Sequence, residues 1–437
     1  MDFLALVNQL NGWFEVPATI IFFAVAMILT VKLRFIQLRS FKRFMRLLTR
    51  GVQTDKQATY TMQTISPIQA LFMAMATTIG IGNVVSPSLA IIVGGPGAMF
   101  WLLAYILFAM VTKYTEVTFA LFTRKRDVNG FVSGGPTQYL RLAHPWIANW
   151  YGLVTIFLFA SWSGCQSSVL AEILQQESVP TWFTGAILAT LVVAVCFGGA
   201  KRIGALASKL VPVMFVSYLT FSLLILFNNL AALHAAFNLV LQHIFTPAAA
   251  VGGFAGASVF QAMKSGAYQA AFITEAGVGT SSIPHAVSDA KRPSDQGILA
   301  MYSMLADGLL CMMSGMLVLM TGVWQGKSEI TGRLIYEVFK NYSPAAGKWV
   351  LLISICLFAL TTVIGNGFNG AQSFGSFTHH RGVKFYFIFV AAVAFISAVS
   401  PAPAVWQIMS LLLVLVVIPN LLSLLYLAWK HPKVLEE

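Results

Sequence analysis

Long apolar runs constrain the fold of this chain more than any other feature. Segments of about 20 mostly apolar residues recur between Ile20 and Trp429, and each is long enough to cross a lipid bilayer as a helix. Of the 437 residues, 58% are hydrophobic and only 10% are charged, whereas soluble domains carry roughly 25% charged residues. This composition excludes a soluble enzyme and a protein that binds nucleic acid. We therefore predict an all-α polytopic membrane protein.

The apolar runs divide the chain into eleven predicted transmembrane spans. They cover residues 17–32, 66–92, 97–123, 150–173, 183–199, 206–228, 252–284, 298–323, 349–370, 385–399 and 405–429. The longest stretch between spans is residues 33–65, so no soluble domain is expected. The start of the chain has an acidic residue, Asp2, and neither a basic region nor a small-residue cleavage site before the first span. A cleaved secretory signal is therefore not predicted.

The net charge of +12 is distributed unevenly between the two sides of the predicted membrane. Loops 33–65, 124–149, 200–209, 285–297 and 371–384, together with Lys32 and the C-terminus, carry 21 of the 27 Lys and Arg residues. By the positive-inside rule these loops are cytoplasmic, which places the N-terminus outside and the C-terminus inside. The short loops favour a bacterial inner membrane. The seven basic residues from Lys32 to Arg50, with no acid among them, are expected to lie along anionic lipid head groups.

Two of the spans contain a pattern that breaks helices. The second span has Gly80-Ile81-Gly82 followed by Pro87, and the seventh has Gly277-Val278-Gly279 followed by Pro284. In a helix interior Gly costs about 1 kcal/mol relative to Ala, and Pro costs about 3 kcal/mol. Either Gly-x-Gly alone could serve close helix packing. The matched pair instead favours a secondary transporter, in which two inverted repeats each begin with an interrupted helix.

The spacing of the breaks predicts the organisation of the chain. Residues 1–65 would form an N-terminal interfacial segment, the first transmembrane helix and a basic loop. Residues 66–228 would form a first five-helix repeat, with its broken helix at 79–83. Residues 252–429 would form a second repeat, with its broken helix at 274–280, and residues 430–437 a cytoplasmic tail. An odd number of spans in each repeat gives the two repeats opposite orientations in the membrane.

Ionisable and amide side chains inside the spans are few, and each is therefore a candidate functional residue. Glu275, at the second break, could neutralise an ammonium group, bind a cation, or cap the free amides near Gly277. Asn83 follows the first break and offers a neutral oxygen to Na⁺ or a bridge between helix halves. Asp307 could relay protons or accept hydrogen bonds at a break. Lys113 and Glu116, three residues apart, are predicted to form a structural ion pair.

Neutral polar side chains could build the rest of a site. Oxygens from Thr77, Thr78, Thr361 and Thr362 could hold a hard cation, although threonine in a span more often bonds its own helix. Trp162 and Gln166 are one helical turn apart, and they could wall a small polar pocket. The alternative is a lipid-facing tryptophan beside a glutamine that is bonded to a neighbouring helix.

Nothing in the sequence predicts an enzyme or a metal cofactor. No nucleophile-and-base arrangement and no cluster of His and Cys ligands is apparent. The four cysteines all lie inside apolar spans and are expected to be small buried residues.

Taken in order, these motifs resemble the alanine or glycine:cation symporter family, the sodium–alanine symporters. The resemblance rests on residues 76–83, 94–97, 112–116, 134–136, 275–279, 285–286, 296–297 and 321–322. It implies a leucine-transporter-like fold, that is, an inverted five-plus-five repeat with one extra N-terminal helix. It also implies Na⁺-driven uptake of a small neutral amino acid, with Na⁺ as the coupling ion and no organic cofactor.

The resemblance and the polar or aromatic residues singled out within the spans together indicate where the ligands would bind. The residues expected at the substrate site are Gly80, Ile81, Gly82, Trp162, Gln166, Phe272, Thr274, Gly277 and Asn366. Those expected to bind or couple the ion are Ala76, Thr78, Ile79, Asn83, Glu275, Thr361 and Thr362. A proton-coupled transporter using Glu275 or Asp307, and an amino-acid sensor that does not transport, are the alternatives.

Two departures from the family pattern affect the expected pocket. Asn366 stands where the family tends to carry tryptophan, and Trp162 stands where the family usually has a small residue. We hypothesise that Trp162 restores from the opposite wall the bulk that Asn366 lacks. The sequence leaves alanine, glycine, serine and glutamine open as substrates.

Overall fold

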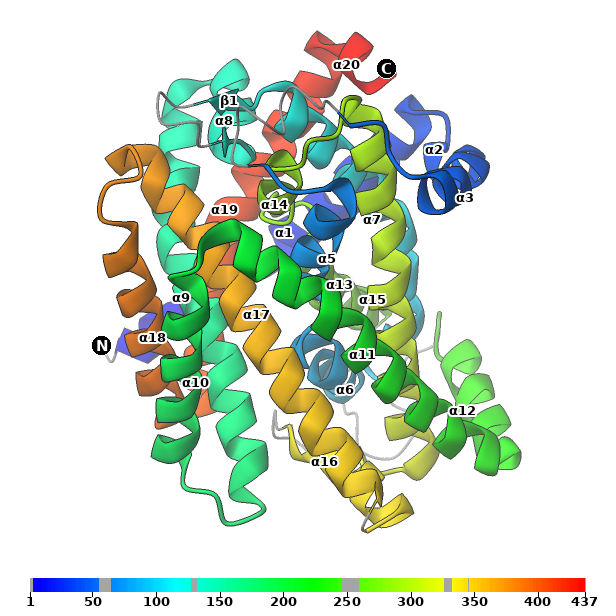
Figure 1. Ribbon diagram of the computed structural model, residues 1–437. Helices are drawn as coiled ribbons and strands as arrows, with labels where there is room; N and C mark the ends of the chain where they lie inside the picture. Colours follow the sequence, from blue (N-terminus) through cyan, green and yellow to red (C-terminus); the bar gives the residue numbers. More distant parts are fainter. Residues whose placement is uncertain are drawn as a thin grey trace.

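A computed structural model describes residues 3–54, 64–126, 132–245, 259–325, 332–344 and 346–436, and most of them are helical (Figure 1). The first part of the chain forms α1 (Phe3–Lys32), α2 (Ile36–Arg39), α3 (Phe41–Arg50), α5 (Pro67–Thr78), α6 (Ile81–Gly94), α7 (Ala98–Phe122), α8 (Pro136–Ala143), α9 (Pro145–Gln175), α10 (Thr181–Cys196) and α11 (Gly199–Asn228). The second part forms α12 (Leu230–Gln242), α13 (Val259–Thr274), α14 (Ser282–Ala286), α15 (Pro293–Thr321), α16 (Arg333–Tyr342), α17 (Ala346–Thr378), α18 (Val383–Ala398), α19 (Ala402–Lys430) and α20 (Pro432–Glu436). A two-stranded antiparallel hairpin, β1 (Lys125–Arg126) and β2 (Val132–Ser133), pairs Lys125 with Ser133.

The long apolar helices confirm the prediction of an all-α membrane protein. Helices α1, α7, α9, α11, α15, α17 and α19 are each long and apolar enough to cross a bilayer. Helices α5 and α6 make an eighth such span as a pair, bent by 42° at the first break. The predicted count of eleven is not confirmed, because α10, α13 and α18 have only 16 residues each. Residues 252–258 of the predicted seventh span lie outside the described residues.

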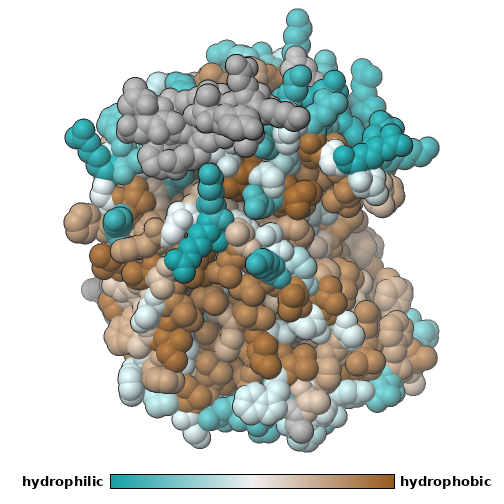
Figure 2. All heavy atoms as spheres, viewed as in Figure 1, coloured by the Kyte–Doolittle hydropathy of each residue, from teal (hydrophilic) through white to brown (hydrophobic). Residues whose placement is uncertain are grey.

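The surface has the pattern of a protein surrounded by lipid. Apolar side chains form a broad belt, and polar side chains gather mainly at the end that carries α2, α3, α8 and α20 (Figure 2). Large side chains on the outer helices, such as Phe157, Val213 and Ile388, are at least half exposed. A bilayer accepts this apolar surface, whereas a soluble monomer rarely exposes so large a patch. The chain is therefore an integral membrane protein.

The two broken helices lie in the interior and run in opposite directions. Helix α6 packs against α13, and α5 packs against α14, so the half before each break meets the half after the other. Helices α7, α9, α15 and α17 surround the breaks (Figure 1). This is the arrangement expected when two repeats of opposite orientation each begin with an interrupted helix.

The start of the first broken helix follows directly from its sequence. Ser66 Oγ accepts a hydrogen bond from the Gln69 backbone N–H, and Gln69 Oε1 accepts one from the Ser66 N–H, each at 3.2 Å. Pro67 follows at the first helical position, where its missing N–H leaves no bond unmade. This capping box fixes where α5 begins.

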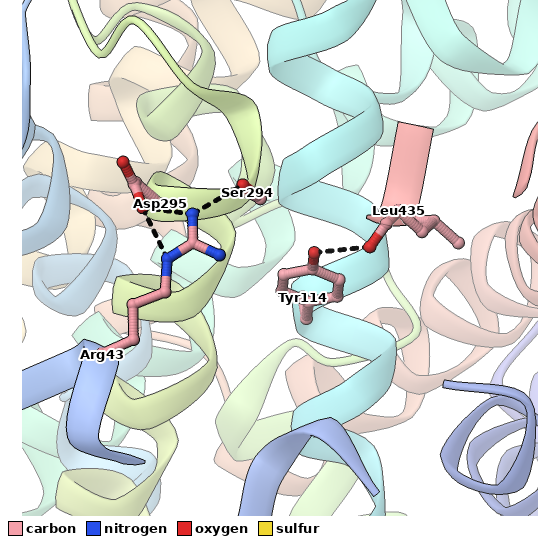
Figure 3. Close-up of polar contacts among 5 residues, drawn as sticks. All are labelled: Arg43, Tyr114, Ser294, Asp295 and Leu435. Carbon is pink, nitrogen blue, oxygen red and sulfur yellow. Dashed lines mark hydrogen bonds and ion pairs between the residues drawn. The ribbon is translucent and has the colours of Figure 1, made fainter. Parts of the chain in front are cut away.

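Polar contacts tie the peripheral helices to the bundle at the charged end (Figure 3). Arg43 on α3 binds Asp295 Oδ1 at 2.5 Å and Ser294 Oγ at 3.0 Å, both in the first turn of α15. The Tyr114 hydroxyl donates to the Leu435 carbonyl at 2.8 Å, which joins α20 to α7. The amphipathic α3 and the C-terminal α20 are thereby held against transmembrane helices.

A second group of ionic contacts lies at the opposite end, where α9 meets α16 and α17. Lys348 Nζ binds Glu177 Oε2 at 2.8 Å, and the Tyr336 hydroxyl donates to the other oxygen of the same carboxylate. These two hydrogen bonds lower the pKa of the Glu177 carboxyl. Arg333 adds a contact of 3.3 Å to Glu172. The contacts hold α16 against the end of α9.

Close backbone packing between α7 and α13 requires glycine at position 266. A Cβ atom added to Gly266 would lie 2.4 Å from the Ala98 carbonyl oxygen and 2.8 Å from the Leu102 nitrogen. Both are backbone atoms, which cannot move aside as a flexible side chain can. We therefore expect Gly266→Ala to destabilise the protein by about 1–3 kcal/mol, as overpacking does in close-packed cores.

Thermal unfolding of the purified protein in detergent measures this effect. The matched control is Gly308→Ala, because a Cβ there meets its nearest neighbour, a side-chain atom of Ile106, at an ordinary 3.6 Å. Equal unfolding temperatures for the two variants would contradict the packing described.

Candidate functional site

The two helix breaks and the helices beside them enclose a small cavity in the interior of the bundle. It is lined by Thr77, Thr78, Gly80, Gly82, Trp162, Gln166, Phe272, Ile273, Glu275, Thr362 and Asn366. Its volume is about 10 Å³, roughly the room that a single water molecule needs. Most of the residues singled out in the sequence as substrate or ion ligands meet here, although they come from four separate segments of the chain.

The first break exposes backbone amides to this cavity. Helix α5 ends at Thr78 and α6 begins at Ile81, so the first amides of α6 have no partner within their own helix. The Ile81 N–H donates to Gln166 Oε1 at 3.0 Å, and the Gly80 N–H donates to Asn83 Oδ1 at 2.9 Å. Helix N-termini bind anionic groups well, and a carboxylate is a stronger acceptor than an amide oxygen. The Ile81 amide is therefore suited to a carboxylate ligand.

Gly80 is clamped between two helices. A Cβ atom at this position would lie 2.5 Å from Thr362 Oγ1 on α17 and 3.2 Å from Gln166 Oε1 on α9. The absence of a side chain lets the unwound backbone come this close to both polar groups. Gly82 likewise lies against the Phe272 ring, whose Cε1 would be 3.2 Å from an added Cβ.

The predicted ion ligands occupy two different positions. The Thr362 hydroxyl donates to the Ile79 carbonyl at 3.4 Å, so this threonine joins α17 to the first break. Thr361 bonds the Leu357 carbonyl of its own helix at 2.8 Å and faces Met214 of α11. Ala76 is buried in the last turn of α5. Within the described ranges no group of three or more His, Cys, Asp or Glu side chains could hold a metal ion.

Asn83 lies behind the first break, away from the cavity lining. Its side-chain oxygen caps Gly80, and its Nδ2 donates to Asp307 Oδ1 of α15 at 3.4 Å. Asn83 thus caps the start of its own helix, α6, and links it to α15 rather than to α5, so the predicted bridge between helix halves is not what its hydrogen bonds form. It also connects the break to a buried carboxylate.

The second break is a longer loop, residues 275–281, with left-handed backbone at three positions. The φ angles are +55° at Glu275, +92° at Gly277 and +87° at Gly279. Glycine adopts such angles without a steric penalty, whereas Glu275 is held there by its surroundings. The Thr280 hydroxyl donates to the Glu275 carboxylate, which also lines the cavity.

Side chains from neighbouring helices satisfy the exposed backbone of this loop. The Tyr151 hydroxyl donates to the Val278 carbonyl at 2.8 Å, and Asn420 Nδ2 donates to the Gly277 carbonyl at 2.8 Å. The Tyr105 hydroxyl donates to the Ala276 carbonyl at 3.3 Å. The sequence analysis did not single out Tyr105, Tyr151 or Asn420. Asn420 carries the clearest signal, because an amide is unusual in so apolar a helix as α19.

Lys113 and Glu116 also bind this break, and the predicted ion pair between them is wrong. Lys113 Nζ donates to the Thr274 carbonyl at 2.5 Å. Glu116 Oε1 accepts from the Gly277 N–H and from Asn420 Nδ2, each at 3.0 Å. One helical turn of α7 thus holds the end of α13 and the loop that follows it. Thr274 and Gly277 are bound to α7 through their backbones and do not line the cavity.

These contacts also correct the reading of Glu275 as a cap for Gly277. The Gly277 amide is capped by Glu116, from a different helix. Glu275 instead accepts from Thr280 and faces the cavity. The φ of +55° at Glu275 shows that the chain leaves the helical direction at this residue.

Aromatic side chains form one wall of the cavity. Trp162 is only 3% exposed, so the alternative of a lipid-facing tryptophan is wrong. Its ring centroid lies 6.0 Å from that of Phe272, which in turn lies 4.9 Å from that of Trp406. Asn366 lines the same cavity, and its buried Oδ1 has no hydrogen-bond partner within the described residues.

Comparison with known proteins identifies the family. Residues 1–437 match the family model described as the sodium:alanine symporter family. The chain belongs to this family. It is 31% identical to an uncharacterized transporter of Haemophilus influenzae, covering 94% of this chain and 90% of the relative. It is 29% identical to the sodium/alanine symporter AgcS of Methanococcus maripaludis, covering 98% and 95%. It is also 29% identical to the probable sodium/glutamine symporter GlnT of Bacillus subtilis, covering 91% and 83%.

A solved structure confirms the fold. MhsT, crystallised with L-phenylalanine, matches with a TM-score of 0.62 over 85% of this symporter-family chain and 90% of its own length. Sequence identity in this match is 14%, so the likeness shows the fold alone. The leucine-transporter-like fold implied by the resemblance is thereby confirmed, and the family itself is confirmed by the family model.

The bonds of Glu116 predict how much this carboxylate stabilises the symporter. Glu116→Ala would leave the Gly277 N–H and Asn420 Nδ2 without their shared acceptor in a buried site. Each unsatisfied buried group costs about 1–3 kcal/mol, so we expect strong destabilisation. Glu116→Gln keeps an acceptor oxygen and should lose less. Thermal unfolding in detergent measures both variants.

The matched control is Glu172→Ala, which removes a carboxylate whose partner Arg333 is 47% exposed. An ion pair with one solvent-exposed partner contributes only about 0–1 kcal/mol. If Glu116→Ala loses no more stability than Glu172→Ala, Glu116 does not stabilise the second break in the way described.

Proposed function

We propose that this protein imports a small neutral amino acid, of the alanine or glycine class, together with Na⁺ by alternating access. Family membership supports a Na⁺-coupled amino-acid symporter. The proposal of an amino-acid substrate is carried by the Ile81 amide at the first break. This amide donates its hydrogen bond to a neutral oxygen, Gln166 Oε1, which a substrate carboxylate could replace. This donor lies beside the Thr362–Ile79 contact, where neutral oxygens could hold Na⁺.

The amino-acid carboxylate would bind at the start of α6. It would take the place of Gln166 Oε1 on the Ile81 N–H, helped by the Gly82 amide and the positive end of the α6 dipole. Released from this bond, Gln166 can turn its NH₂ group toward the carboxylate. The substrate ammonium would face Glu275 and the end of α13, because both line the cavity. Lys113 already binds the Thr274 carbonyl, so Glu275 is the stronger partner.

The aromatic wall limits the size of the substrate side chain. Trp162 and Phe272 face the glycines of the first break, and Gly82 lies against the Phe272 ring. The cavity can admit an amino acid only if its walls move apart. A methyl group or a hydrogen atom demands the least movement, which favours alanine and glycine. Serine or glutamine is the second candidate, because the unpaired Asn366 Oδ1 could accept a hydrogen bond from such a side chain.

Na⁺ would bind between α5 and α17. Its ligands would be the carbonyls of Ala76 and Ile79 and the hydroxyl of Thr362, with Thr361 a weaker ligand because it bonds its own helix, and Thr78 lies close by on the cavity wall. The ion would fix the unwound backbone in the shape that accepts the carboxylate. Substrate must then tighten Na⁺ binding by the same factor, because coupling between two sites is reciprocal.

The membrane potential can drive this transport. One positive charge moving inward gains about 2.3 kcal/mol per 100 mV. That energy corresponds to roughly a fiftyfold concentration of the solute. The two breaks are natural hinges, because unwound backbone bends more easily than a hydrogen-bonded helix.

The charge distribution supports a specific orientation. The loops that carry most of the Lys and Arg residues connect to α2, α3, α8 and α20, which gather at one end of the molecule (Figure 1). We place this end in the cytoplasm of a bacterial cell, at the inner membrane, with the N-terminus outside. Helix α3, with exposed Phe41 and Met45 beside basic residues, would lie along the lipid head groups.

Uptake of labelled L-alanine into proteoliposomes tests the proposal. We expect accumulation with an inward Na⁺ gradient, and none with an equal K⁺ gradient or a pH gradient alone. Accumulation driven by the pH gradient without Na⁺ would favour the proton-coupled alternative. Binding of an amino acid without uptake would favour a sensor.

Two neighbouring threonines provide matched variants for the ion site. Thr362→Val should raise the Na⁺ concentration for half-maximal uptake by about tenfold, the effect of losing roughly 1.4 kcal/mol of binding. Thr361→Val should have a smaller effect, because Thr361 already bonds its own helix. Equal effects at the two positions would contradict the assignment of Thr362 as the closer ligand.

Trp162 and Asn366 line the same cavity, so the hypothesis that Trp162 supplies the bulk that Asn366 lacks can be tested by exchanging the two positions. We expect Trp162→Gly and Asn366→Trp to impair alanine uptake singly and to restore much of it when combined. The reason is that each change alone leaves the pocket too open or too full. Losses that simply add in the double variant would refute the idea that the two positions share one pocket volume.

A further inference from the structure

Two adjoining cavities lie outside the proposed transport site, near the charged end of the molecule. The larger has a volume of about 650 Å³ and lies between the α10–α11 junction, the end of α17 and the start of α18. The smaller has a volume of about 300 Å³ and lies beside β1, β2 and α8. Both cavities are lined by His380, so they meet at this residue. Volumes of this size are typical of ligand sites.

The smaller cavity is basic. Its lining includes Lys125 of β1, Arg141 of α8, and His379 and His380 in the turn after α17. The other polar side chains around it are neutral, namely Ser133, Gln138 and Ser376. Among the described residues, no aspartate or glutamate lines either cavity. An anion bound here would therefore meet only basic or neutral groups.

The protein itself supplies little negative charge to this region. Helices α8, α10, α11, α17 and α18 contain no aspartate or glutamate. The ion pairs found in the described ranges do not include Lys125, Arg141 or Lys384. Arg141 instead binds two neutral oxygens, the Thr137 carbonyl at 3.1 Å and Asn149 Oδ1 at 3.2 Å. The positive charge gathered here therefore favours an anion from outside the protein.

The larger cavity is mainly apolar and opens toward the lipid belt. Its walls include Phe197, Phe385 and Ile388, which are 45%, 75% and 51% exposed. Lys384 also lines it, and its Nζ lies 5.9 Å from the centre of the Phe197 ring. Helix α18 begins near the charged end and runs from there into the apolar belt (Figures 1 and 2). An amphipathic anion, with its charge at that end and its apolar part in the belt, would match both cavities.

We propose that the two cavities together bind one anionic phospholipid of the leaflet at the charged end. The phosphate and head group would lie in the basic cavity, between Lys125, Arg141 and His380. An acyl chain would lie in the apolar cavity, against Phe385 and Ile388. A soluble phosphate would use only the first cavity, and an uncharged lipid only the second. The inference does not depend on the proposed Na⁺ coupling.

A lipid bound here would contact a helix that also lines the transport cavity. Helix α17 contributes Phe368 and Ala371 to the apolar cavity, and Thr362 and Asn366 to the cavity between the breaks. The lipid would fill the space between the start of α11 and the start of α18, and so hold this end of α17 in place. A ligand that binds only the folded protein raises its unfolding temperature.

Titration of the purified full chain in mild detergent with dioleoylphosphatidylglycerol tests the inference. Thermal unfolding measures stabilisation, and native mass spectrometry counts the lipids that each chain retains. For the natural sequence we expect a saturable rise in unfolding temperature. Dioleoylphosphatidylcholine has no net charge and should stabilise the protein much less. Glycerol 3-phosphate, which has the charge but no acyl chains, should not stabilise it.

Two variants address the two cavities separately. Lys125→Gln with Arg141→Gln should raise the half-saturating concentration of phosphatidylglycerol by roughly 25-fold, since each basic residue near an anionic lipid contributes about fivefold. Ala200→Phe fills the apolar cavity without a change of charge, and it should retain one lipid fewer. The control, Lys42→Gln with Arg46→Gln, removes the same charge from α3 on the other side of the molecule (Figure 1). It should leave the titration nearly unchanged.

The remaining outcomes would each overturn the inference. Equal weakening in the α3 control and the basic-cavity variant would show general attraction to anionic lipid. Stabilisation by glycerol 3-phosphate, with no effect of Ala200→Phe, would show a soluble phosphate ligand. Equal stabilisation by the two lipids would show that charge is not recognised. Val383→Phe, which also fills the apolar cavity, replaces Ala200→Phe if that variant is unstable without lipid.

Discussion

The structure depends on satisfying backbone hydrogen bonds where two helices are unwound inside the membrane. Lipid offers no partners, so each exposed amide or carbonyl must find one within the protein. The first break relies on Asn83, Gln166 and Thr362, and the second relies on side chains of α7, α9 and α19. The helices around the breaks therefore carry polar groups on their inner faces and apolar groups on the faces that meet lipid.

The two breaks are braced in different ways, and this difference suggests different roles. Around the first break, two of the partners, Gln166 on α9 and Thr362 on α17, are neutral side chains that also line the cavity, so a ligand can replace them. Around the second break, Lys113 and Glu116 hold both sides from one turn of α7, and Asn420 adds a bond from α19. Charged partners buried in this way are costly to release. The backbone at the first break can therefore change its hydrogen-bond partners when a ligand binds, whereas the backbone at the second break keeps its partners.

Sequence reasoning found most cavity residues because polar or glycine residues in an apolar span are conspicuous. Gly80, Gln166, Glu275 and Thr362 were singled out on that ground, and all four line one cavity. The same reasoning misread Lys113 and Glu116, because spacing along a helix shows that two side chains can meet, and not that a neighbouring backbone binds them better. Tyr105 and Tyr151 were missed because tyrosine in an apolar span gives no signal until its hydroxyl is seen to reach a carbonyl.

The sequence by itself determined the membrane environment, the helical class, the positions of both breaks and the family. Each of these follows from local composition, from charge placed outside the apolar runs, or from motifs read in order. Only the tertiary structure decided which polar groups meet, because that depends on how α7, α9, α17 and α19 pack around the breaks. It also decided the positive φ of Glu275, the choice of Thr362 over Thr361 at the first break, and the partners of Lys113. These are contacts between segments distant in sequence, and no local pattern encodes them.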